Sequence, residues 1–113
     1  MTLPNRGEIW FLDLSPTQGR EQSGSRPALV ISDDRFNHGP AELVVVVPIT
    51  SKFKGIPSHV PLLPPEGGVT QPSFIKCEDI RSVSRWRLAK RWGTVAPHTM
   101  TAVEDRLRML LNL

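Results

Sequence analysis

The sequence predicts a mainly β domain of the α+β class, in which a small, strongly bent antiparallel sheet or barrel carries one C-terminal helix. Three observations support this prediction. The 113 residues include 11 prolines and 8 glycines, many of them in short clusters that divide the chain into strand-length segments. The apolar runs between these clusters are short and rich in β-branched residues. Only near the end of the chain does the apolar spacing become helical.

Two buried strands are predicted in the first half of the chain. A first strand over residues 8–14 is bounded by glycine and by a Ser-Pro pair, and residues 15–26 then form a predicted loop with almost no apolar side chains. Loops of about 12 residues inside a compact domain are usually functional or disordered. Residues 27–32 are nearly all apolar and predict a strand buried on both faces. After a turn-rich connection over residues 33–40, residues 43–49 contain four consecutive valines and predict the next strand.

Shorter strands are predicted in the second half. Residues 51–57 carry two lysines and a Gly-x-Pro break, so they should form a basic loop. Residues 59–63 read as a short strand, and their proline favours an edge position because proline cannot donate to the ladder. A turn over residues 64–68 follows. The remaining predicted strands cover residues 73–78, 80–84 and 90–95.

A C-terminal helix is predicted from Pro97, which suits the first helical position. Its apolar residues fall on one face at helical spacing, and charged residues occupy the other face. We expect the apolar face to pack against the open side of the barrel. That face comprises Met100, Val103, Leu107, Leu110 and Leu111. The simplest form with these elements is an SH3-like barrel with one helix, and its size indicates a single domain over residues 1–113.

Composition limits the compartment and the partners. The net charge of +3 permits an anionic partner but does not require one. A single cysteine, Cys77, rules out an intramolecular disulfide and fits a reducing compartment. The N-terminus lacks a signal-peptide pattern, and no apolar run approaches the ~20 residues of a membrane span. We expect a soluble, cytoplasmic protein that does not bind membranes.

Metal and nucleophile motifs are weak in this sequence. His38, His59 and His98 are scattered, without the paired spacing of a metal site. Cys77 lies in an alternating segment, where a cysteine is usually a small buried side chain. No Gly-x-Ser-x-Gly elbow, P-loop or dinucleotide fingerprint is present. We therefore expect neither a metal ion nor a cofactor.

Arg26 and Thr50 stand at the ends of two predicted core strands. Each has an ordinary structural interpretation, because Arg26 could pair with a nearby carboxylate and Thr50 could satisfy its own backbone. Together they favour phosphate chemistry, since a guanidinium is a planar fork of donors and a fixed hydroxyl adds one more. RNA cleavage needs little else, because the ribose 2′-hydroxyl supplies the attacking oxygen.

Glu78 is the third candidate, two positions beyond Lys76 and so on the same face of the predicted strand. Its carboxylate could form a cross-strand ion pair or accept the proton of the 2′-hydroxyl. The three tryptophans could stack on bases, although burial is their commoner role. If they share a face, several cations would contact phosphates: Lys52, Lys54, Arg81, Arg85, Arg87, Lys90 and Arg91.

Four segments in this order resemble the MazF/PemK family of toxin endoribonucleases. They are residues 6–10 (RGEIW), 15–22 (SPTQGREQ), 26–32 (RPALVIS) and 48–51 (PITS), and the likeness continues through residues 73–81 and the C-terminal helix. The resemblance implies an SH3-like barrel, a homodimer and cleavage of single-stranded RNA without a metal ion. The products would be a 2′,3′-cyclic phosphate and a 5′-hydroxyl. It also implies a MazE-like antitoxin whose disordered tail blocks the RNA groove, and growth arrest without it.

The resemblance assigns roles by position. Arg26 and Thr50 match the catalytic arginine and threonine of the family, and Glu78 matches an acidic position that some members use as a base. Lys76 stands where certain members carry an arginine proposed as general acid, so that role is not carried over to this sequence. Because a guanidinium releases its proton poorly, we assign Arg26 mainly to charge stabilisation, with proton transfer as a secondary role. The segment over residues 15–25 matches the loop that borders the site. We expect RNA contacts from Arg20, Gln22, Ser51, Lys52, Lys54, Gln71, Lys76 and Arg81.

Two other functions fit the same barrel. The related gyrase-poisoning toxins are not enzymes and use a terminal Trp-Gly-Ile motif, whereas this sequence ends Leu111-Asn112-Leu113. An SH3-like peptide-binding module needs a groove lined by tyrosine and tryptophan, and this sequence contains no tyrosine.

Overall fold

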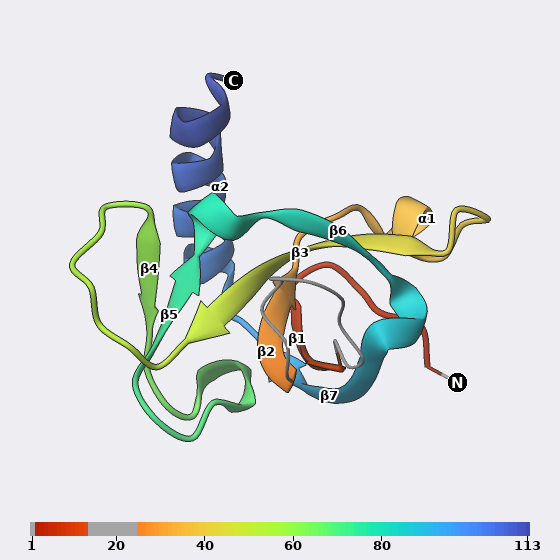
Figure 1. The fold of residues 1–113 in the computed structure, drawn as a ribbon, viewed down its shortest axis with the longest axis horizontal. Coiled ribbons are helices and arrows are strands. Elements are labelled where there is room, and N and C mark those ends of the chain that lie inside the picture. Colours follow the sequence, from red (N-terminus) through yellow and green to blue (C-terminus); the bar gives the residue numbers. More distant parts are fainter. Residues whose placement is uncertain (1, 14–24) are drawn as a thin grey trace, which may run out of the picture.

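The structure is a computed structural model that describes residues 2–13 and 25–113. Within them, seven strands form an antiparallel sheet in the order β4-β5-β3-β2-β1-β7, with β6 also paired to β3 (Figure 1). The strands are β1 (Glu8–Asp13), β2 (Ser25–Val30), β3 (Leu43–Thr50), β4 (His59–Leu62), β5 (Ser73–Lys76), β6 (Arg81–Ser84) and β7 (Leu88–Thr94). The helices are α1 (Asp34–Asn37) and α2 (Pro97–Leu111), and the 3-10 turns are η1 (Glu66–Gly68), η2 (Cys77–Asp79) and η3 (Arg85–Arg87).

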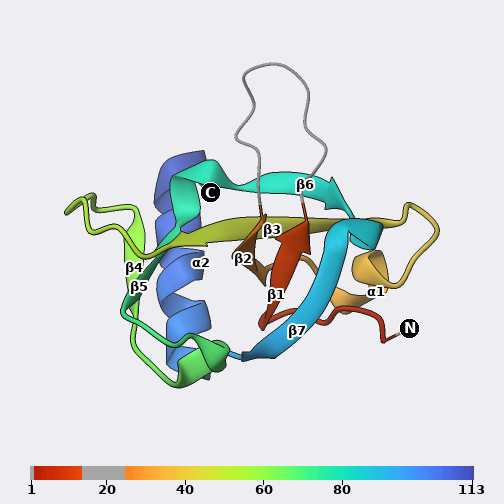
Figure 2. The same cartoon turned by 60° about the horizontal axis from the view of Figure 1, so that its bottom comes forward.

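The sheet bends around β3. The first half of β3 pairs with β6 through Leu43 to Val46, whereas its last two residues, Ile49 and Thr50, pair with β5. Because successive parts of one strand have different neighbours, the β4–β5 hairpin turns away from the rest of the sheet (Figure 2). Within the described ranges the strand order begins at β4 and ends at β7, so the fold is a strongly bent open sheet rather than a closed barrel. The predicted fold class is confirmed with this refinement.

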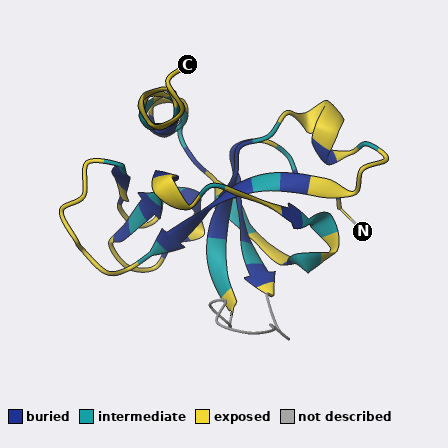
Figure 3. Ribbon diagram, turned by 45° about the horizontal axis from the view of Figure 1, so that its top comes forward, coloured by how far each residue is buried: buried dark blue, intermediate teal, exposed yellow. Residues whose placement is uncertain are grey.

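Both faces of the central strands are buried, as Figure 3 shows by the dark blue centres of the strands. Ala28, Leu29 and Val30 of β2 are fully buried, which confirms the prediction for this segment. The period-2 alternation sends neighbouring residues into two different apolar clusters. Leu29 packs in the cluster beneath α2, and Ala28 and Val30 pack with Trp10 in the other.

Most predicted elements are found, with shifts of one or two residues at their ends. The predicted proline-containing strand is β4, and it lies at an edge of the sheet. Residues 34–37, predicted as part of a turn, instead form the short helix α1, because the side chain of Asp33 caps the amide of Arg35. The strand predicted over residues 73–78 stops at Lys76. A 3-10 turn replaces its last two residues, so Glu78 does not lie on a strand face with Lys76.

The helix α2 begins at Pro97 as predicted, but only part of its apolar face is covered. Val103 is fully buried, and Met100 and Leu107 pack partly against the core. The prediction that Leu110 and Leu111 belong to the core is wrong, since they are 46% and 50% exposed. The physical reason is geometric, because the last turns of α2 project beyond the sheet (Figure 1). Among the described residues, no helix is long and apolar enough to cross a membrane.

Glycines allow the turn η1 to cross closely over β7. A Cβ atom on Gly67 would lie 2.4 Å from Cδ1 of Ile9, and Gly67 also has a φ of +64°, which disfavours other residues. A Cβ atom on Gly93 of β7 would lie 2.8 Å from the carbonyl carbon of Gly67. The crossing therefore fixes the start of the segment that runs from η1 to β5.

Candidate active site

Arg26 and Thr50 come from neighbouring antiparallel strands. Ala28 of β2 pairs with Pro48 of β3, and continuing that register by two residues brings Arg26 opposite Thr50. Residues opposite each other in an antiparallel pair project to the same face of the sheet. At this point β3 leaves β2 and pairs with β5 instead, with Thr50 opposite Phe74. The divergence of the strands opens a space next to both side chains.

That space is a cavity of about 360 Å³. It contains the predicted site residues Arg26 and Thr50, together with amides, hydroxyls and three lysines. Its lining is Ser25, Arg26, Pro27, Ile49, Thr50, Ser51, Lys52, Lys54, Val69, Thr70, Gln71, Ser73, Lys76 and Trp92. We call it the phosphate cavity, because its polar lining is cationic and contains no carboxylate among the described residues.

Arg26 also borders a second cavity of about 280 Å³, which is lined by Leu12, Arg26, Pro48, Glu78, Asp79, Ile80 and Arg81. We call it the acidic cavity. The guanidinium-bearing side chain is therefore shared between the two cavities, and it is partly exposed. Within the described part of the chain, neither Asp33 nor any other carboxylate pairs with Arg26: Asp33 pairs with Arg35. Glu21, the other partner considered for Arg26, lies outside the described residues. Among the described carboxylates none neutralises Arg26, and its side chain borders both cavities.

The hydroxyl of Thr50 is oriented by its own loop. Its Oγ1 accepts a hydrogen bond of 3.1 Å from the backbone N–H of Lys52. This local bond is the structural alternative to a catalytic role for Thr50. The two are compatible, because a hydroxyl that accepts one hydrogen bond still has its own proton to donate.

Glu78 lies in the acidic cavity rather than in the phosphate cavity. Its Oε1 accepts a hydrogen bond of 2.7 Å from Ser58 Oγ, and its Oε2 lies 2.8 Å from Nε2 of His59. Burial alone would raise the pKa of Glu78, but the hydrogen bonds from Ser58, from its own backbone amide and from His59 together lower it below the usual value. The carboxylate is therefore held ionised.

His59 was not singled out by the sequence. The side chain is 3% exposed, and Nδ1 has no hydrogen-bond partner among the described residues. A single histidine in a short strand carries no signal of its own. Its polar contact is with Glu78, which comes from the turn η2, 19 residues further along the chain. Sequence spacing could not reveal this contact.

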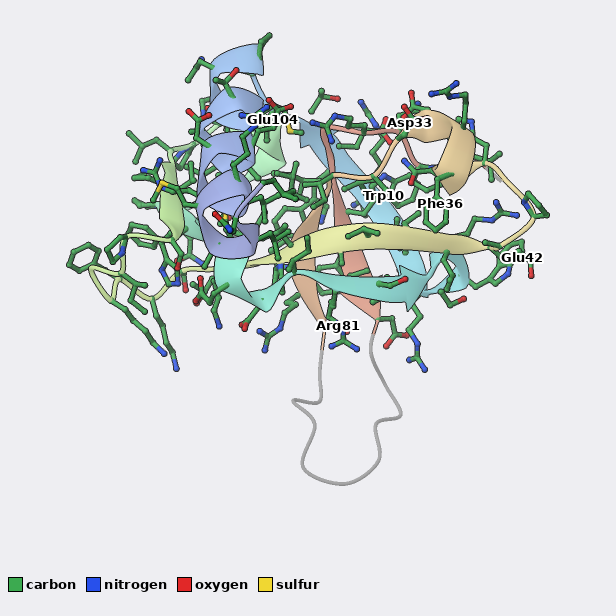
Figure 4. All side chains as sticks on the ribbon, turned by 90° about the horizontal axis from the view of Figure 1, so that it is seen from above. Trp10, Asp33, Phe36, Glu42, Arg81 and Glu104 are labelled. Atoms are coloured by element: carbon green, nitrogen blue, oxygen red, sulfur yellow. The ribbon has the colours of Figure 1, made fainter. Side chains whose placement is uncertain are left out.

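The expected RNA-contacting residues divide between the two cavities. Ser51, Lys52, Lys54, Gln71 and Lys76 line the phosphate cavity, whereas Arg81 lines the acidic cavity. Figure 4 shows Arg81 near the ends of β1 and β2. Lys76 also pairs with Asp79 at 2.8 Å, so it bridges the rims of both. Arg20 and Gln22 lie outside the described residues.

Two further cations make contacts outside the two cavities, and the three tryptophans lie in different surroundings. Arg85 donates to the carbonyl oxygens of Asn37 and Gly39, and Arg91 pairs with Glu8 at 2.7 Å. The tryptophans separate: Trp10 is buried, Trp86 is 58% exposed, and Trp92 lines the phosphate cavity while stacking on Phe11.

The predicted inert cysteine is confirmed. Cys77 is fully buried, and burial raises the pKa of its thiol to about 11, with the charge of Glu78 adding to the effect. A thiol in that state is a poor nucleophile at neutral pH. In residues 2–13 and 25–113, no group of three His, Cys, Asp or Glu side chains is arranged to hold a metal ion.

Comparison with known proteins identifies the family. The model of the PemK-like, MazF-like toxins of type II toxin–antitoxin systems matches residues 5–111. The chain belongs to this family. A curated relative, endoribonuclease MazF9 from Mycobacterium tuberculosis, is 35% identical over 113 residues, which cover 96% of each chain. Endoribonuclease EndoA from Bacillus subtilis is 33% identical and covers 96% of this chain and 94% of its own.

Solved structures of PemK/MazF toxins have the same fold. The crystal structure of MazF from Deinococcus radiodurans superposes with a TM-score of 0.84 at 32% identity, over 100% of both chains. The predicted family, and the prediction of an endoribonuclease toxin, are confirmed by these comparisons.

Proposed function

We propose that this PemK/MazF-family endoribonuclease cleaves single-stranded RNA without a metal ion, through attack of a ribose 2′-hydroxyl on the adjacent phosphodiester. A bond forms between phosphorus and the 2′-oxygen, and the bond from phosphorus to the 5′-oxygen breaks. The products are a 2′,3′-cyclic phosphate and a 5′-hydroxyl, which takes up the proton that balances the step. The observation that carries this proposal is that Arg26 and Thr50 share one cationic cavity.

Arg26 is the proposed stabiliser of the transition state. Negative charge accumulates on the non-bridging oxygens as the 2′-oxygen attacks, and a guanidinium can donate two parallel hydrogen bonds to them. Its pKa is too high for it to act as a ready proton donor. The hydroxyl of Thr50, already accepting from Lys52, would donate its proton to one of the same oxygens.

Glu78 is the proposed acceptor of the 2′-hydroxyl proton. It borders the acidic cavity, which shares Arg26 with the phosphate cavity, and a ribose bound in the acidic cavity would lie next to the carboxylate. The hydrogen bonds from Ser58 and His59 fix its orientation. The lowered pKa makes it a weaker base, so transition-state stabilisation by Arg26 supplies the larger share of catalysis in this proposal.

Phosphates on either side of the scissile bond would contact cations at the rims of the two cavities. Ser51, Lys52, Lys54, Gln71 and Lys76 belong to one rim and Arg81 to the other, and Arg20 and Gln22 are proposed contacts outside the described residues. Lysine and arginine contacts to a backbone are independent of base sequence. They would position the strand, and other groups would select the site of cleavage.

The proposed partners follow from the family. A structure of MazE–MazF from Deinococcus radiodurans, with a TM-score of 0.83 and 32% identity over 100% of this chain, is described as a complex of those two proteins. We therefore propose a MazE-like antitoxin for this toxin, acting in the cytoplasm.

We also propose a homodimer, supported by the exposed apolar residues at the end of α2: Met109, Leu110, Leu111 and Leu113.

RNA cleavage in the presence of a metal chelator tests the central proposal. Purified protein should cut single-stranded RNA in excess EDTA and leave ends that are cyclic phosphates and 5′-hydroxyls. Arg26→Ala should lower the rate by at least ~10²-fold while circular dichroism stays unchanged, because a main source of charge stabilisation is lost. Arg35→Ala, which removes an exposed cation of α1 outside both cavities, is the matched control and should cleave at the wild-type rate. A fully active Arg26→Ala protein would refute the assignment.

A further inference from the structure

The loop between β3 and β4 borders the phosphate cavity and presents an exposed aromatic ring. All residues from 51 to 57 are exposed, and Phe53 is 76% exposed. Leaving the apolar surface of a phenylalanine in water instead of burying it costs free energy, roughly 25 cal/mol for each Å². Lys52 and Lys54, on either side of Phe53 in the sequence, both line the phosphate cavity.

The ring of Phe53 is held in place by two neighbours. Its centroid lies 5.5 Å from that of Phe74, with an angle of 53° between the rings. A Cβ atom added to Gly55 would lie 3.5 Å from Cζ of Phe53, so the edge of the ring rests near the Gly55 backbone. Phe74 is the cross-strand partner of Thr50. These contacts seat the ring against Phe74, whose strand pairs with Thr50, while leaving most of the ring surface open.

We propose that Phe53 is a stacking platform for one nucleobase of single-stranded RNA, adjacent to the phosphate held by Arg26 and Thr50. Alternating aromatic and cationic side chains suit unpaired nucleic acid, because the ring stacks on a base while the cations follow the backbone. This inference rests on the proposed function and extends it, since it names a residue that binds a base rather than the reacting phosphate.

The surroundings of Phe53 favour RNA over a protein partner. The neighbouring lysines face the polar phosphate cavity, together with Ser51 and Gln71. The apolar groove on the α2 side of the same loop is lined by other residues: Ile56, Pro57, Ser58, Arg106, Met109 and Leu110. A purely apolar protein contact would be expected to use that groove and would gain nothing from Lys52 and Lys54.

Binding of an RNA that cannot be cut tests the platform. The probe is a short single strand containing a site cleaved by the wild-type protein, with a 2′-O-methyl group at the attacking nucleotide, followed by fluorescence anisotropy. Phe53→Ala and Phe53→Leu should bind about 5- to 100-fold more weakly, since each loses the aromatic face. Phe53→Trp should bind at least as tightly as wild type. Phe36→Ala removes another exposed ring, on α1 at the far end of the molecule, and should bind normally (Figure 4).

Abasic substitutions in the probe identify the stacked base. Removing that base should weaken wild-type binding but leave Phe53→Ala binding unchanged, because the contact is already lost. Wild-type affinity in Phe53→Ala, or additive losses at every abasic position, would overturn the inference. A Phe53→Ala protein with normal RNA affinity but an altered mass in solution would likewise overturn it and assign the ring to a protein interface. The proposed function fails separately, if wild-type protein does not cleave RNA at all.

Discussion

At the scale of single residues, the hydroxyl of Thr50 has a defined direction. The backbone N–H of Lys52 donates to its oxygen, so the proton of the hydroxyl is directed away from that bond. Thr50 closes β3, where its backbone is paired with Phe74. A donor held on a strand end and by its own loop needs little reorganisation when charge develops on a phosphate.

Two substitutions distinguish hydrogen-bond donation by the Thr50 hydroxyl from packing of the Thr50 side chain. Thr50→Val keeps the branched side chain but loses the donor, and should lower the cleavage rate by about 10²- to 10³-fold, as for other lost oxyanion donors. Thr50→Ser keeps the donor, and its cleavage rate should fall less than about tenfold, because only a methyl group that restricts rotation is removed. Single-turnover cleavage rates measure both. Equal losses in the two variants would show that packing, not donation, is the role of Thr50.

Some of these residues could be identified from the sequence, and others could not. Arg26 and Thr50 could be found because each ends an apolar run, and strand pairing then brings both to one cavity. His59 and Phe53 could not, since their significance comes from partners in other elements: Glu78 for His59, and Phe74 for Phe53. Contacts between segments far apart in sequence leave no local pattern.

At the scale of elements, the start of α2 is stabilised from outside the helix. Ala96, at the N-cap, has no side chain that can accept a hydrogen bond. Oε2 of Glu66, in the turn η1, instead accepts hydrogen bonds from the backbone N–H of Ala96 and from the hydroxyl of Thr99. Its negative charge also lies at the helix end where the dipole is positive. One carboxylate thus joins η1 to α2.

Removing that carboxylate should destabilise the protein. Glu66→Ala is expected to lower the free energy of unfolding by about 1 to 2 kcal/mol, the usual effect of losing a helix cap. Asp105→Ala is a control within α2, because Asp105 forms only an exposed pair with Arg108 and should contribute less than about 0.5 kcal/mol. Urea denaturation followed by circular dichroism measures both. Similar losses in the two variants would contradict the capping role.

Elements were predictable where the apolar period was regular. The segment from Leu43 to Thr50 needed no tertiary information, because its valines read as a strand in any context. The end of β5 was not predictable, since alternation continues through Glu78 although the backbone turns at Cys77. The face of α2 was correctly identified, but the sequence could not show that the sheet ends before Leu110.

At the scale of the whole molecule, two ionised carboxylates make stability depend on pH. For Glu8, burial opposes ionisation, but hydrogen bonds from Trp10, from the Asn5 amide and from Arg91 lower the pKa below the usual value. The pKa of Glu78 is lowered in the same sense. A carboxyl whose pKa is lower in the folded state stabilises the protein above its unfolded pKa, and this contribution is lost as pH falls through the folded pKa.

The contribution of these two carboxylates to the free energy of unfolding should therefore be nearly constant from pH 7 to about 5 and fall below about pH 4.3, the ordinary glutamate value. The free energy of unfolding of the Glu78→Gln variant should fall less steeply over this acid range, because one of the titrating groups is absent. Urea denaturation between pH 3 and pH 7 gives both curves. Parallel curves for wild type and Glu78→Gln would mean that Glu78 titrates alike in the folded and unfolded states.

The same variant examines the proposed proton acceptor. Glutamine keeps the size of the side chain but cannot take a proton, so Glu78→Gln should cleave RNA about 10²- to 10⁴-fold more slowly at pH 7. The cleavage rate of the wild type should rise with pH through the acid range, and that rise should be missing in the variant. An unchanged rate would leave Glu78 with a structural role only.

The fold class was predictable from the sequence, but whether the sheet closes into a barrel was not. Short apolar runs and many turns indicate a bent antiparallel sheet with one helix. Whether β4 meets β7 depends on how sharply β3 bends, and that depends on pairing with β5 and β6 rather than on any local sequence.

The glycine crossing of η1 over β7 has a consequence for how this toxin could acquire new sequence preferences. The segment that follows η1 contributes Val69, Thr70 and Gln71 to the phosphate cavity, and its starting point is set by backbone contacts at Gly67 and Gly93. Side chains at positions 70 and 71 could therefore be exchanged without moving β2 and β3, which carry Arg26 and Thr50, the proposed reacting groups. Under the proposed function, exchanges at these two positions should change which RNA is cut and leave the cleavage step itself unaltered.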